Sequence, residues 1–413
     1  MNKFYRNATE TRKPTKLERL FRASPLGPLW GVAITFLIII QACSSSPEVE
    51  LPEEIASLEN LAVFPADTEP MREIELIPET VFGGTEDVLL SEWLMVHVDQ
   101  RGRVFIGDNR QTVIHLYNPD GSYSRRIGGE GDGPGEYRAI GVMQSDDDYF
   151  YHYDRRNRRI TRYDPDTFEV MGDFSVSVPS DEDAAFPLSF TSFSLVPDDD
   201  LMLAHLSMGF RAGRADADPS ERRMRGRMLN AETGEFSGEE VYNFPASEAL
   251  VQYSDERMSV MSVPYKRSSV VQVHDDALIH GWNEHFLFKF YDLDGQYQRA
   301  VYYDFENPPL NRNEILVEYQ DRSEPWKSMV ENDDMPETWP SWTTFMPDDQ
   351  GRLWVQRRTD DPDVTQYHVL SPSGELLAVI PWNPDHRIQK IQNGNLWSLE
   401  VNEDGLREVV KYG

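Results

Sequence analysis

One pattern recurs along this chain and constrains its fold more than any other: a turn rich in Asp, Asn or Gly, followed directly by a short aromatic or aliphatic run. Asp and Asn side chains accept hydrogen bonds from backbone amides two residues further on, and Gly adopts positive φ at little cost, so this composition favours tight turns. Alternating apolar residues between such turns are typical of strands with a buried face. The pattern occurs six times, with turns at 99–103, 146–148, 198–200, 274–276, 348–352 and 392–395.

A second turn of similar composition follows in five of the six units and predicts further strands outside the first pair. These second turns lie at 118–121, 164–166, 230–234, 292–295 and 371–374. Six units of about four strands predict an all-β fold, a six-bladed β-propeller with four-stranded blades, which leaves only short, protected sheet edges. The last unit ends on its third strand, at 406–412, so we expect an N-terminal strand at 74–77 to complete this blade and close the ring.

The propeller is expected to span 71–413, with two insertions that interrupt the repeat. The first, near 209–227, is rich in arginine. The second, near 305–341, contains a helix-like segment at 313–320 and several prolines that break up the rest. Residues 43–70 are rich in acids and proline, a composition typical of a tether, with a short helix expected at 55–61.

The first 42 residues predict export from the cytoplasm. Seven basic residues precede an apolar run at 29–40, and small residues surround Cys43, the single cysteine of the chain. Charged, apolar and small parts in this order are typical of a secretion signal. The alternative is an uncleaved transmembrane helix over about 25–43, close to the lower limit of roughly 17 residues for crossing a bilayer. Both interpretations attach the globular part to a membrane on its extracytoplasmic side.

The sequence around Cys43 also resembles the lipobox of bacterial lipoproteins. Ile40 stands three residues before the cysteine and Ala42 directly before it, whereas Gln41 is less usual. The resemblance implies that 1–42 is a signal peptide, that cleavage occurs before Cys43, and that Cys43 is then lipidated. In Gram-negative bacteria, Ser44 at the next position would favour the outer membrane, facing the periplasm.

The charge of the chain excludes one class of partner. The net charge is −31, and the residues after Cys43 carry 33 basic and 69 acidic side chains. Such a body repels phosphate backbones, so nucleic-acid binding is not expected. Solubility is the ordinary explanation of this acidity, and a divalent-cation site is the alternative.

The repeats resemble those of a known family. A glycine-rich turn at 128–133 leads into Pro134-Gly135-Glu136-Tyr137, and Asp154, Asn157 and Arg159 later precede an aliphatic residue. This order is similar to the NHL-type repeat. The region 72–412 resembles the bacterial six-bladed β-propeller lipoproteins of NHL-like type, most strongly in its first two units. The resemblance implies the fold and export, and that group has no single activity to carry over.

Polar residues close the second strand of each unit and form one candidate site. Equivalent positions of a propeller converge near one face of the central channel, where carboxylates and imidazoles together could bind Ca²⁺ or Zn²⁺. The alternative is structural, with the aspartates capping their own turns and the histidines ordinary part-buried residues. The candidate channel ligands are Asp108, Asp154, His205, His280 and Glu400, with Arg357 at the same position of the fifth unit.

Other features have competing explanations. The stretch 128–137 lacks the Gly-Lys-Ser/Thr of a phosphate loop and is expected to be a turn between blades. The arginines of the first insertion could bind an anion or could form a solvated loop. Four tryptophans near the insertions could form a sugar or peptide platform or could pack the insertion on the blades: Trp282, Trp326, Trp339 and Trp342.

The sequence therefore favours a membrane-anchored, extracytoplasmic propeller that acts as a non-catalytic binding or scaffold module. A protein, peptide or glycan is expected on the loop face or in the channel. The alternative is a metal-dependent hydrolase or lyase, because some six-bladed lactonases and NHL-like amidating lyases bind metal at the channel. A purely structural envelope protein is a third hypothesis. We find no Gly-x-Ser-x-Gly elbow, no His-Glu-x-x-His and no dinucleotide fingerprint.

Overall fold

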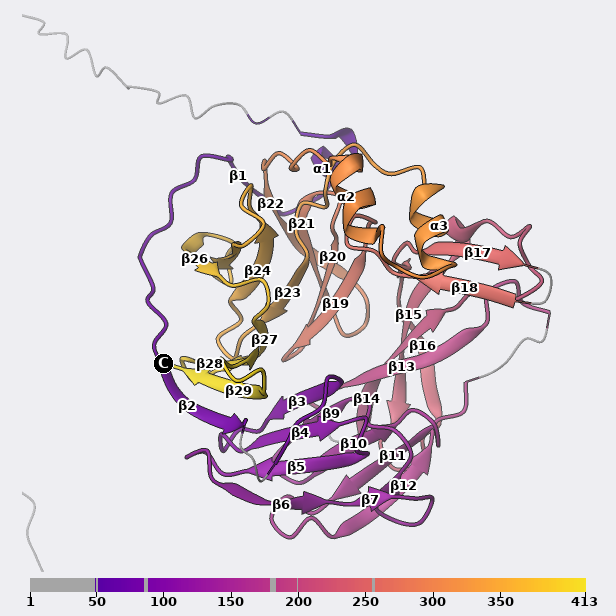
Figure 1. The fold of residues 1–413 in the computed structure, drawn as a ribbon, viewed down its shortest axis with the longest axis vertical. Coiled ribbons are helices and arrows are strands. Elements are labelled where there is room, and N and C mark those ends of the chain that lie inside the picture. The colour runs from indigo at the N-terminus through magenta and orange to yellow at the C-terminus, as the bar shows by residue number, and fades with distance from the viewer. Residues whose placement is uncertain (1–48, 50, 85–87, 179–182, 199, 255–256) are drawn as a thin grey trace, which may run out of the picture. The chain divides into compact units, whose positions relative to one another are not determined.

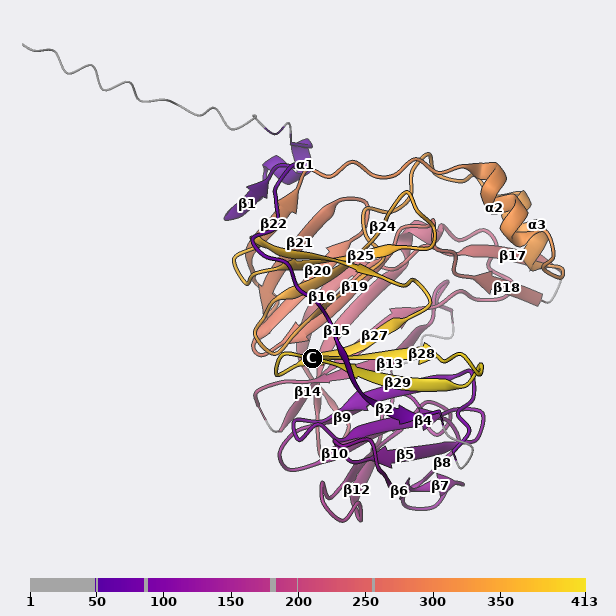
Figure 2. The same cartoon turned by 60° about the vertical axis from the view of Figure 1, so that its left-hand side comes forward.

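The computed structural model describes residues 49, 51–84, 88–178, 183–198, 200–254 and 257–413. Cys43 and the leader lie outside these residues. The described chain forms a ring of six blades, five of them four-stranded sheets and one a five-stranded sheet, and it is a six-bladed β-propeller (Figures 1 and 2). Within the described residues, no helix is long and apolar enough to cross a membrane.

Blades 1 to 3 follow one another along the chain, each an antiparallel meander whose second strand begins at a predicted turn. Blade 1 comprises β3 (Leu94–Val98), β4 (Val104–Asp108), β5 (Val113–Tyr117) and β6 (Tyr123–Ile127). Blade 2 comprises β9 (Met143–Ser145), β10 (Phe150–Asp154), β11 (Arg159–Tyr163) and β12 (Val170–Ser175). Blade 3 comprises β13 (Leu188–Leu195), β14 (Leu201–Met208), β15 (Arg223–Asn230) and β16 (Phe236–Pro245).

Blades 4 and 5 repeat the same order. Blade 4 comprises β19 (Ser269–His274), β20 (Ala277–Trp282), β21 (Phe286–Asp292) and β22 (Tyr297–Tyr303). Blade 5 comprises β23 (Thr344–Pro347), β24 (Leu353–Arg358), β25 (Thr365–Leu370) and β26 (Leu376–Trp382). The first strands of neighbouring blades contact one another, for example β3 with β9 and β19 with β23, so they line the inside of the ring.

Blade 6 closes the ring with a strand from the other end of the chain. It comprises β27 (Arg387–Gln392), β28 (Asn395–Val401), β29 (Arg407–Tyr412) and β2 (Pro78–Gly83). The prediction of closure by an N-terminal strand is confirmed, but the predicted segment is wrong. The closing strand is β2, which pairs antiparallel with β29. Ile74 and Leu76 instead pack against the apolar cluster of blades 5 and 6, which explains their alternating pattern.

The segment expected to be a tether is partly structured. Helix α1 (Glu53–Ala56) is shorter and earlier than expected, and its Ile55 is buried. Strand β1 (Leu61–Phe64) then runs parallel to β22 and adds a fifth strand to blade 4. Phe64 stacks on Tyr303 with ring centroids 4.7 Å apart. Residues 51–64 are therefore part of the folded propeller.

The insertions differ from their predicted bounds. The first spans 209–222, with a short 3₁₀ helix η1 (Pro219–Glu221), because β15 already begins at Arg223. The second contains the predicted helix as α2 (Arg312–Tyr319) and a further helix α3 (Trp326–Glu331). A third insertion, between blades 3 and 4, forms the hairpin β17 (Leu250–Ser254) and β18 (Arg257–Met261), which the sequence did not predict.

The second and third insertions share one small core. Helices α2 and α3 lie beside the hairpin β17–β18 on one side of the ring (Figures 1 and 2). We call this assembly the cap. Its buried apolar residues come from both insertions: Leu250, Val263, Tyr265, Ile315, Met329 and Val330.

The glycine-rich stretch is the predicted connection between blades 1 and 2. Its two-residue strands β7 (Gly129–Glu130) and β8 (Glu136–Tyr137) pair in parallel. Gly128 has a φ of 64°, and a Cβ atom there would lie 2.4 Å from the carbonyl oxygen of Gly135. The Tyr137 hydroxyl donates to the carbonyl of Ile127 and accepts from the amide of Ile114. The stretch is thus a turn tied to blade 1, and its sequence lacks the Gly-Lys-Ser/Thr of a phosphate loop.

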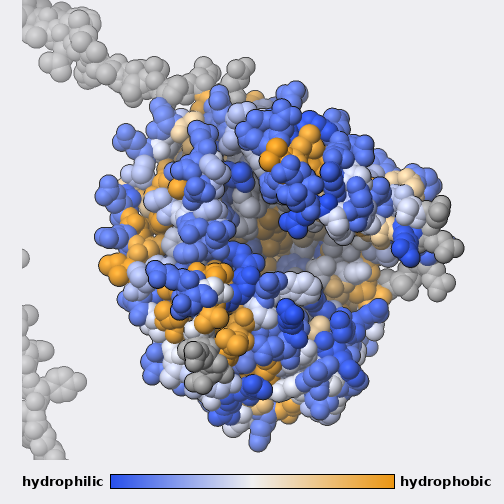
Figure 3. Space-filling view, viewed as in Figure 1, coloured by the Kyte–Doolittle hydropathy of each residue, from blue (hydrophilic) through white to orange (hydrophobic). Residues whose placement is uncertain are grey.

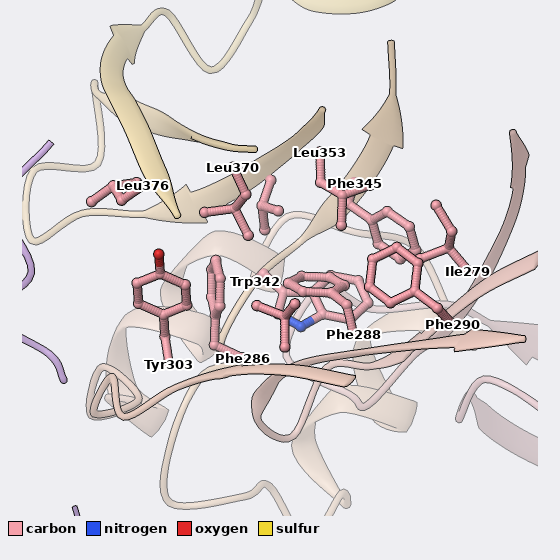
Figure 4. Close-up of a cluster of buried hydrophobic side chains, with 12 residues drawn as sticks. Ile279, Phe286, Phe288, Phe290, Tyr303, Trp342, Phe345, Leu353, Leu370 and Leu376 are labelled. Atoms are coloured by element: carbon pink, nitrogen blue, oxygen red, sulfur yellow. The ribbon is translucent and has the colours of Figure 1, made fainter. Parts of the chain in front are cut away.

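Apolar layers between the blades hold the ring together. Figure 4 shows the layer between blades 4 and 5, where Phe286, Phe288 and Phe290 leave one face of β21. They meet Phe345 and Leu353 of blade 5. Alternate residues of a strand share a face, so the intervening residues of β21 point toward blade 3 instead. The outer surface is mostly hydrophilic and is hollowed near the middle of the face in Figure 3.

Candidate binding site

Asp108 lies at the end of β4 and links two backbone segments through its hydrogen bonds. Its carboxylate accepts hydrogen bonds from the amides of Arg110 and Gln111 in the following turn. It also accepts from the amide and hydroxyl of Ser91, in the segment before β3. Burial acts to raise the pKa of Asp108, but the bonds from Ser91 and Gln111 outweigh burial and hold the pKa below its ordinary value.

Asp154 repeats this arrangement in blade 2. It accepts hydrogen bonds from the amides of Arg156 and Asn157, which follow it. It also accepts from the amides of Arg138 and Ala139, which precede β9. Both aspartates therefore join the turn after the second strand to the segment that enters the blade.

His205 and His280 are brought together at the boundary of blades 3 and 4. The Nδ1 atom of His205 lies 2.7 Å from the hydroxyl of Tyr242. The Tyr242 ring stacks on Phe244, which stacks on the imidazole of His280 at 3.8 Å between centroids. Burial lowers the pKa of His205 to about 4 and, with the positive charge of Lys289, that of His280 to about 3. Both imidazoles are therefore neutral at pH 7.

Glu400 and Arg357 contact different residues from each other and from the two histidines. Glu400 accepts from the Tyr412 hydroxyl at 2.8 Å, and its other oxygen lies 3.3 Å from Nδ1 of His386. The Arg357 guanidinium lies over the Phe305 ring and donates to the carbonyl of Ser341. Burial lowers the pKa of Arg357 to about 10.

The predicted channel site is not assembled. Across the described part of the chain, no group of three or more His, Cys, Asp and Glu side chains is placed to hold a metal ion. Asp108, Asp154, His205, His280 and Glu400 are each bonded to a protein group instead. Only the two histidines share one cluster. In this structure the five side chains make structural contacts, and the Ca²⁺ or Zn²⁺ site stays a prediction.

A different site lies between blades 3 and 4, under the cap and next to α1. It consists of two hollows, of about 250 Å³ and about 360 Å³, and the side chain of Trp282 lines both. We call it the Trp282 cleft. The first hollow is lined by Glu54, Ile55, His280, Trp282, Leu287 and Lys289 among others. The second is lined by Arg222, Ala246, Ser247, Glu248, Lys266 and Trp282 among others.

Strand alternation explains how the cleft forms. His280 and Trp282 of β20 and Leu287 and Lys289 of β21 share the face of blade 4 that is turned toward blade 3. His280 and Lys289 are cross-strand neighbours. The inserted segments 219–222 and 245–249 supply the opposite wall.

The three basic side chains of the cleft differ in whether a carboxylate pairs with them. Lys266 is paired with Asp333 at 2.9 Å. Arg222 donates only to the carbonyls of Met208 and Ser247 and lies over the Phe210 ring. Among the described residues, neither Arg222 nor Lys289 forms an ion pair with a carboxylate.

A larger hollow of about 700 Å³ lies between the outer turns of blades 3 and 4. Its described lining has no aromatic or basic side chain. The acids that line it are Asp198, Glu239, Glu240, Asp276 and Asp294. Size alone does not define a ligand site. Apolar residues line this hollow as well, but all charged side chains of its described lining are acidic and it offers no basic or aromatic group to a ligand.

The remaining predicted residues are mostly structural. Trp342 is fully buried in the layer between blades 4 and 5. Trp326 and Trp339 pack against the core of the cap. Arg211 and Arg223 donate to backbone carbonyls, and Arg225 pairs with Glu240, so the arginines of the first insertion do not form one anion site.

Sequence reasoning named Trp282, His280 and, among the arginines of the first insertion, Arg222, but it missed Lys289 and Ile55. Lys289, Arg222 and Ile55 come from three distant segments that only the fold brings together. The one available signal was the odd-numbered face of β21, where Leu287 and Lys289 alternate with three phenylalanines.

Comparisons with known proteins support the fold class. A family model described as a six-bladed beta-propeller, DUF5128, matches residues 71–186, which include β2 and blades 1 and 2. No curated protein matches the chain. The solved structure of a provisionally assigned exported protein from Bacteroides fragilis is 11% identical, with a TM-score of 0.50 over 86% of this chain and 99% of that one.

A second solved structure, a member of the DUF4221 family from Bacteroides vulgatus, is 13% identical. Its TM-score is 0.52, over 83% of this chain and 99% of that one. At such low identity these similarities support the shared fold alone. The class of protein is therefore a six-bladed β-propeller.

Proposed function

We propose that this protein is an extracytoplasmic, membrane-anchored binding module of NHL-like type, and that its ligand occupies the Trp282 cleft. The anchor is a lipid on Cys43, by the pattern of the leader around that residue. The assignment of a fold neighbour to export is in keeping with this location.

One observation carries the proposal: the indole of Trp282 lines two adjoining hollows at once. Its N–H donates to no acceptor among the described residues. Ligand sites typically combine an aromatic or apolar wall with a few unpaired polar groups. A Trp side chain with a free donor supplies both, because one edge is polar and the faces are apolar.

Binding is favoured over catalysis because the candidate acids and imidazoles already have structural partners. Asp108 and Asp154 hold backbone amides on two sides. A catalytic base requires access to the proton that it abstracts. The cleft instead combines one wall from the rigid sheet of blade 4 with surface from α1 and from the inserted segments.

An array of soluble oligosaccharides and short peptides tests this proposal. The purified full chain in detergent is compared with W282A and with W93A, which removes a tryptophan that is 75% exposed outside the cleft. We expect at least one class of probe to bind the wild type and W93A, and to lose binding to W282A. Equal binding to all three forms, or none to any, would contradict the proposal.

A further inference from the structure

The Trp282 cleft contains basic side chains that pair with no carboxylate among the described residues, in a strongly acidic protein. The net charge of the chain is −31, so an unpaired basic side chain in a hollow is a marked local exception. Lys289 lies in the first hollow and Arg222 in the second, on either side of Trp282. Neither side chain is opposed by a carboxylate within ion-pair distance among the described residues.

His280 adds an unpaired polar atom at the wall of the first hollow. Only 6% of this residue is exposed, and its Nε2 atom lies 2.9 Å from the hydroxyl of Ser269. The other ring nitrogen, Nδ1, has no hydrogen-bond partner among the described residues. Nδ1 is not enclosed by the protein, so a ligand in the first hollow can reach it and form a hydrogen bond with it.

The apolar surface of the first hollow indicates that the ligand has a ring that lies flat against it. Ile55 and Leu287 join the indole of Trp282 along the first hollow. The hollow of about 250 Å³ has room for a single ring beside the tryptophan. The imidazole of His280, which lines this hollow, is held by stacking on Phe244.

We propose that the Trp282 cleft binds a ring-bearing carboxylate, whose ring lies against Trp282 and whose carboxylate accepts hydrogen bonds from Lys289. This inference rests on the proposed function and names the ligand class of the same site. Two sources share this chemistry, sugar acids and aromatic acids. Arg222 would hold a second anionic unit of a longer chain in the adjoining hollow.

Two carboxylates line the cleft, Glu54 in the first hollow and Glu248 in the second, and Glu54 opposes an anion in the hollow that it shares with Lys289. Glu54 lines the first hollow, and its Oε1 atom lies 3.6 Å from Nε2 of His285. Neutralising Glu54 removes repulsion of an anion, whereas neutralising Lys289 removes its partner. E54Q and K289Q therefore change affinity in opposite directions.

Calorimetry with matched probes tests the inference. The probes are tetragalacturonate, its full methyl ester and indole-3-carboxylate, titrated into the full chain in detergent. Because charge-assisted hydrogen bonds are among the strongest, we expect the acid to bind roughly tenfold or more tighter than its ester. K289Q abolishes this difference, K289R retains most of it, E54Q enlarges it, and W93A leaves it unchanged. Melting curves check that each variant is folded.

The outcomes separate this inference from the proposed function. Binding of indole-3-carboxylate alone, lost in K289Q, supports the carboxylate and identifies the aromatic source. Equal affinity for the acid and the ester overturns the inference and leaves a neutral ligand for the cleft. Failure of all carboxylates to bind, while another array probe depends on Trp282, also overturns it but leaves the proposed function intact. If W282A affects no probe, both fail.

Discussion

The imidazole of His280 lies parallel to the ring of Phe244, 3.8 Å between centroids and 8° between planes, across the boundary of blades 3 and 4. Tyr242 and His205 extend this stack into blade 3. Two residues that the sequence nominated as metal ligands thus form part of the wall between two blades. The Trp282 cleft lies directly along this wall, because His280 also lines its first hollow.

The stack depends on a glycine, and this gives a first prediction. A Cβ atom on Gly226 would lie 2.1 Å from the ring of Tyr242. G226A must therefore push Tyr242 away from His205, and we expect a loss of about 2 kcal/mol in the free energy of unfolding, as for other overpacked sites. Urea denaturation measures the loss.

Gly129 supplies the control for this substitution. A Cβ atom there meets nothing within 4 Å, and its φ lies outside the positive region. We expect G129A to change the stability by less than about 0.5 kcal/mol, as for ordinary surface positions. Equal losses in the two variants would show that Tyr242 tolerates displacement.

The buried histidines predict a loss of stability in mild acid. Burial lowers the pKa of His97 and His280 to about 3, and that of His152 and His205 to about 4. The unfolded chain takes up these protons near pH 6.5, whereas the folded chain does not. The stabilisation is therefore complete above pH 6.5 and decreases as the pH falls toward 4, by about 1.4 kcal/mol per pH unit for each histidine.

A variant isolates the histidine contribution from the titration of the many carboxylates. H280F keeps a flat ring on Phe244 but cannot bind a proton. Urea denaturation between pH 6.5 and 4.5 should give a shallower decline for H280F than for the wild type. Parallel declines would contradict a low folded-state pKa for His280.

Closure of the ring by β2 predicts a contrast between two adjacent residues. Phe82 is fully buried in the cluster that includes Trp397 and Val409 of blade 6. Val81, on the opposite face of the same strand, is 46% exposed. We expect F82A to cost about 3–5 kcal/mol and V81A less than about 1 kcal/mol.

Thermal unfolding of the two variants, and of a chain without residues 404–413, tests closure. The deletion removes β29, the partner of β2, and should destabilise the whole ring in one transition. If F82A and the deletion both unfold like the wild type, β2 does not close the propeller.

The contacts of Arg357 predict that blade 5 stabilises the two ends of the second insertion. Its guanidinium donates to the carbonyl of Ser341 and lies 4.1 Å from the centre of the Phe305 ring. R357A leaves that carbonyl without its donor and removes the stack, so we expect a loss of about 2 kcal/mol. Hydrogen exchange should show the greatest change near residues 305 and 341.

R110A is the matched control, because Arg110 is exposed and contacts Asp108 only through its backbone amide. It should leave hydrogen exchange near residues 305 and 341 unchanged. A uniform change across the propeller in R357A would argue against a local coupling.

Much of the fold was predictable because it repeats. The turn compositions placed the starts of the second strands correctly, as at Val104, Leu201 and Leu353. Local hydrogen bonding explains this success, since residues such as Asp348 bond to amides within their own turn. Asp108 and Asp154 likewise accept hydrogen bonds from amides of the turns that follow them, which is the structural alternative that the sequence analysis gives for these two residues.

The rest depends on contacts between distant segments. The closing strand was misplaced because the segment 74–77 begins with alternating apolar and polar residues whereas 78–83 does not alternate, and only pairing with β29 identifies 78–83. Strand β1 adds to blade 4 through contacts such as that of Asn60 with the carbonyl of Gln298, 238 residues away. The hairpin β17–β18 belongs to no repeat. Lys289 was not predicted, because the hollow that it lines also needs Glu54 and Ile55 from α1, far away in the sequence.

The most direct test of the central claim is ¹⁹F NMR of the full chain in detergent, labelled with 5-fluorotryptophan. Trp30 lies in the leader that is predicted to be cleaved, so the mature protein is expected to have eight tryptophans, and W282F and W93F assign two of their signals. On titration with the oligosaccharides and peptides of the array, the account predicts that a binding probe shifts the Trp282 signal and leaves the Trp93 signal unchanged. A bound probe that leaves the Trp282 signal unmoved would contradict it.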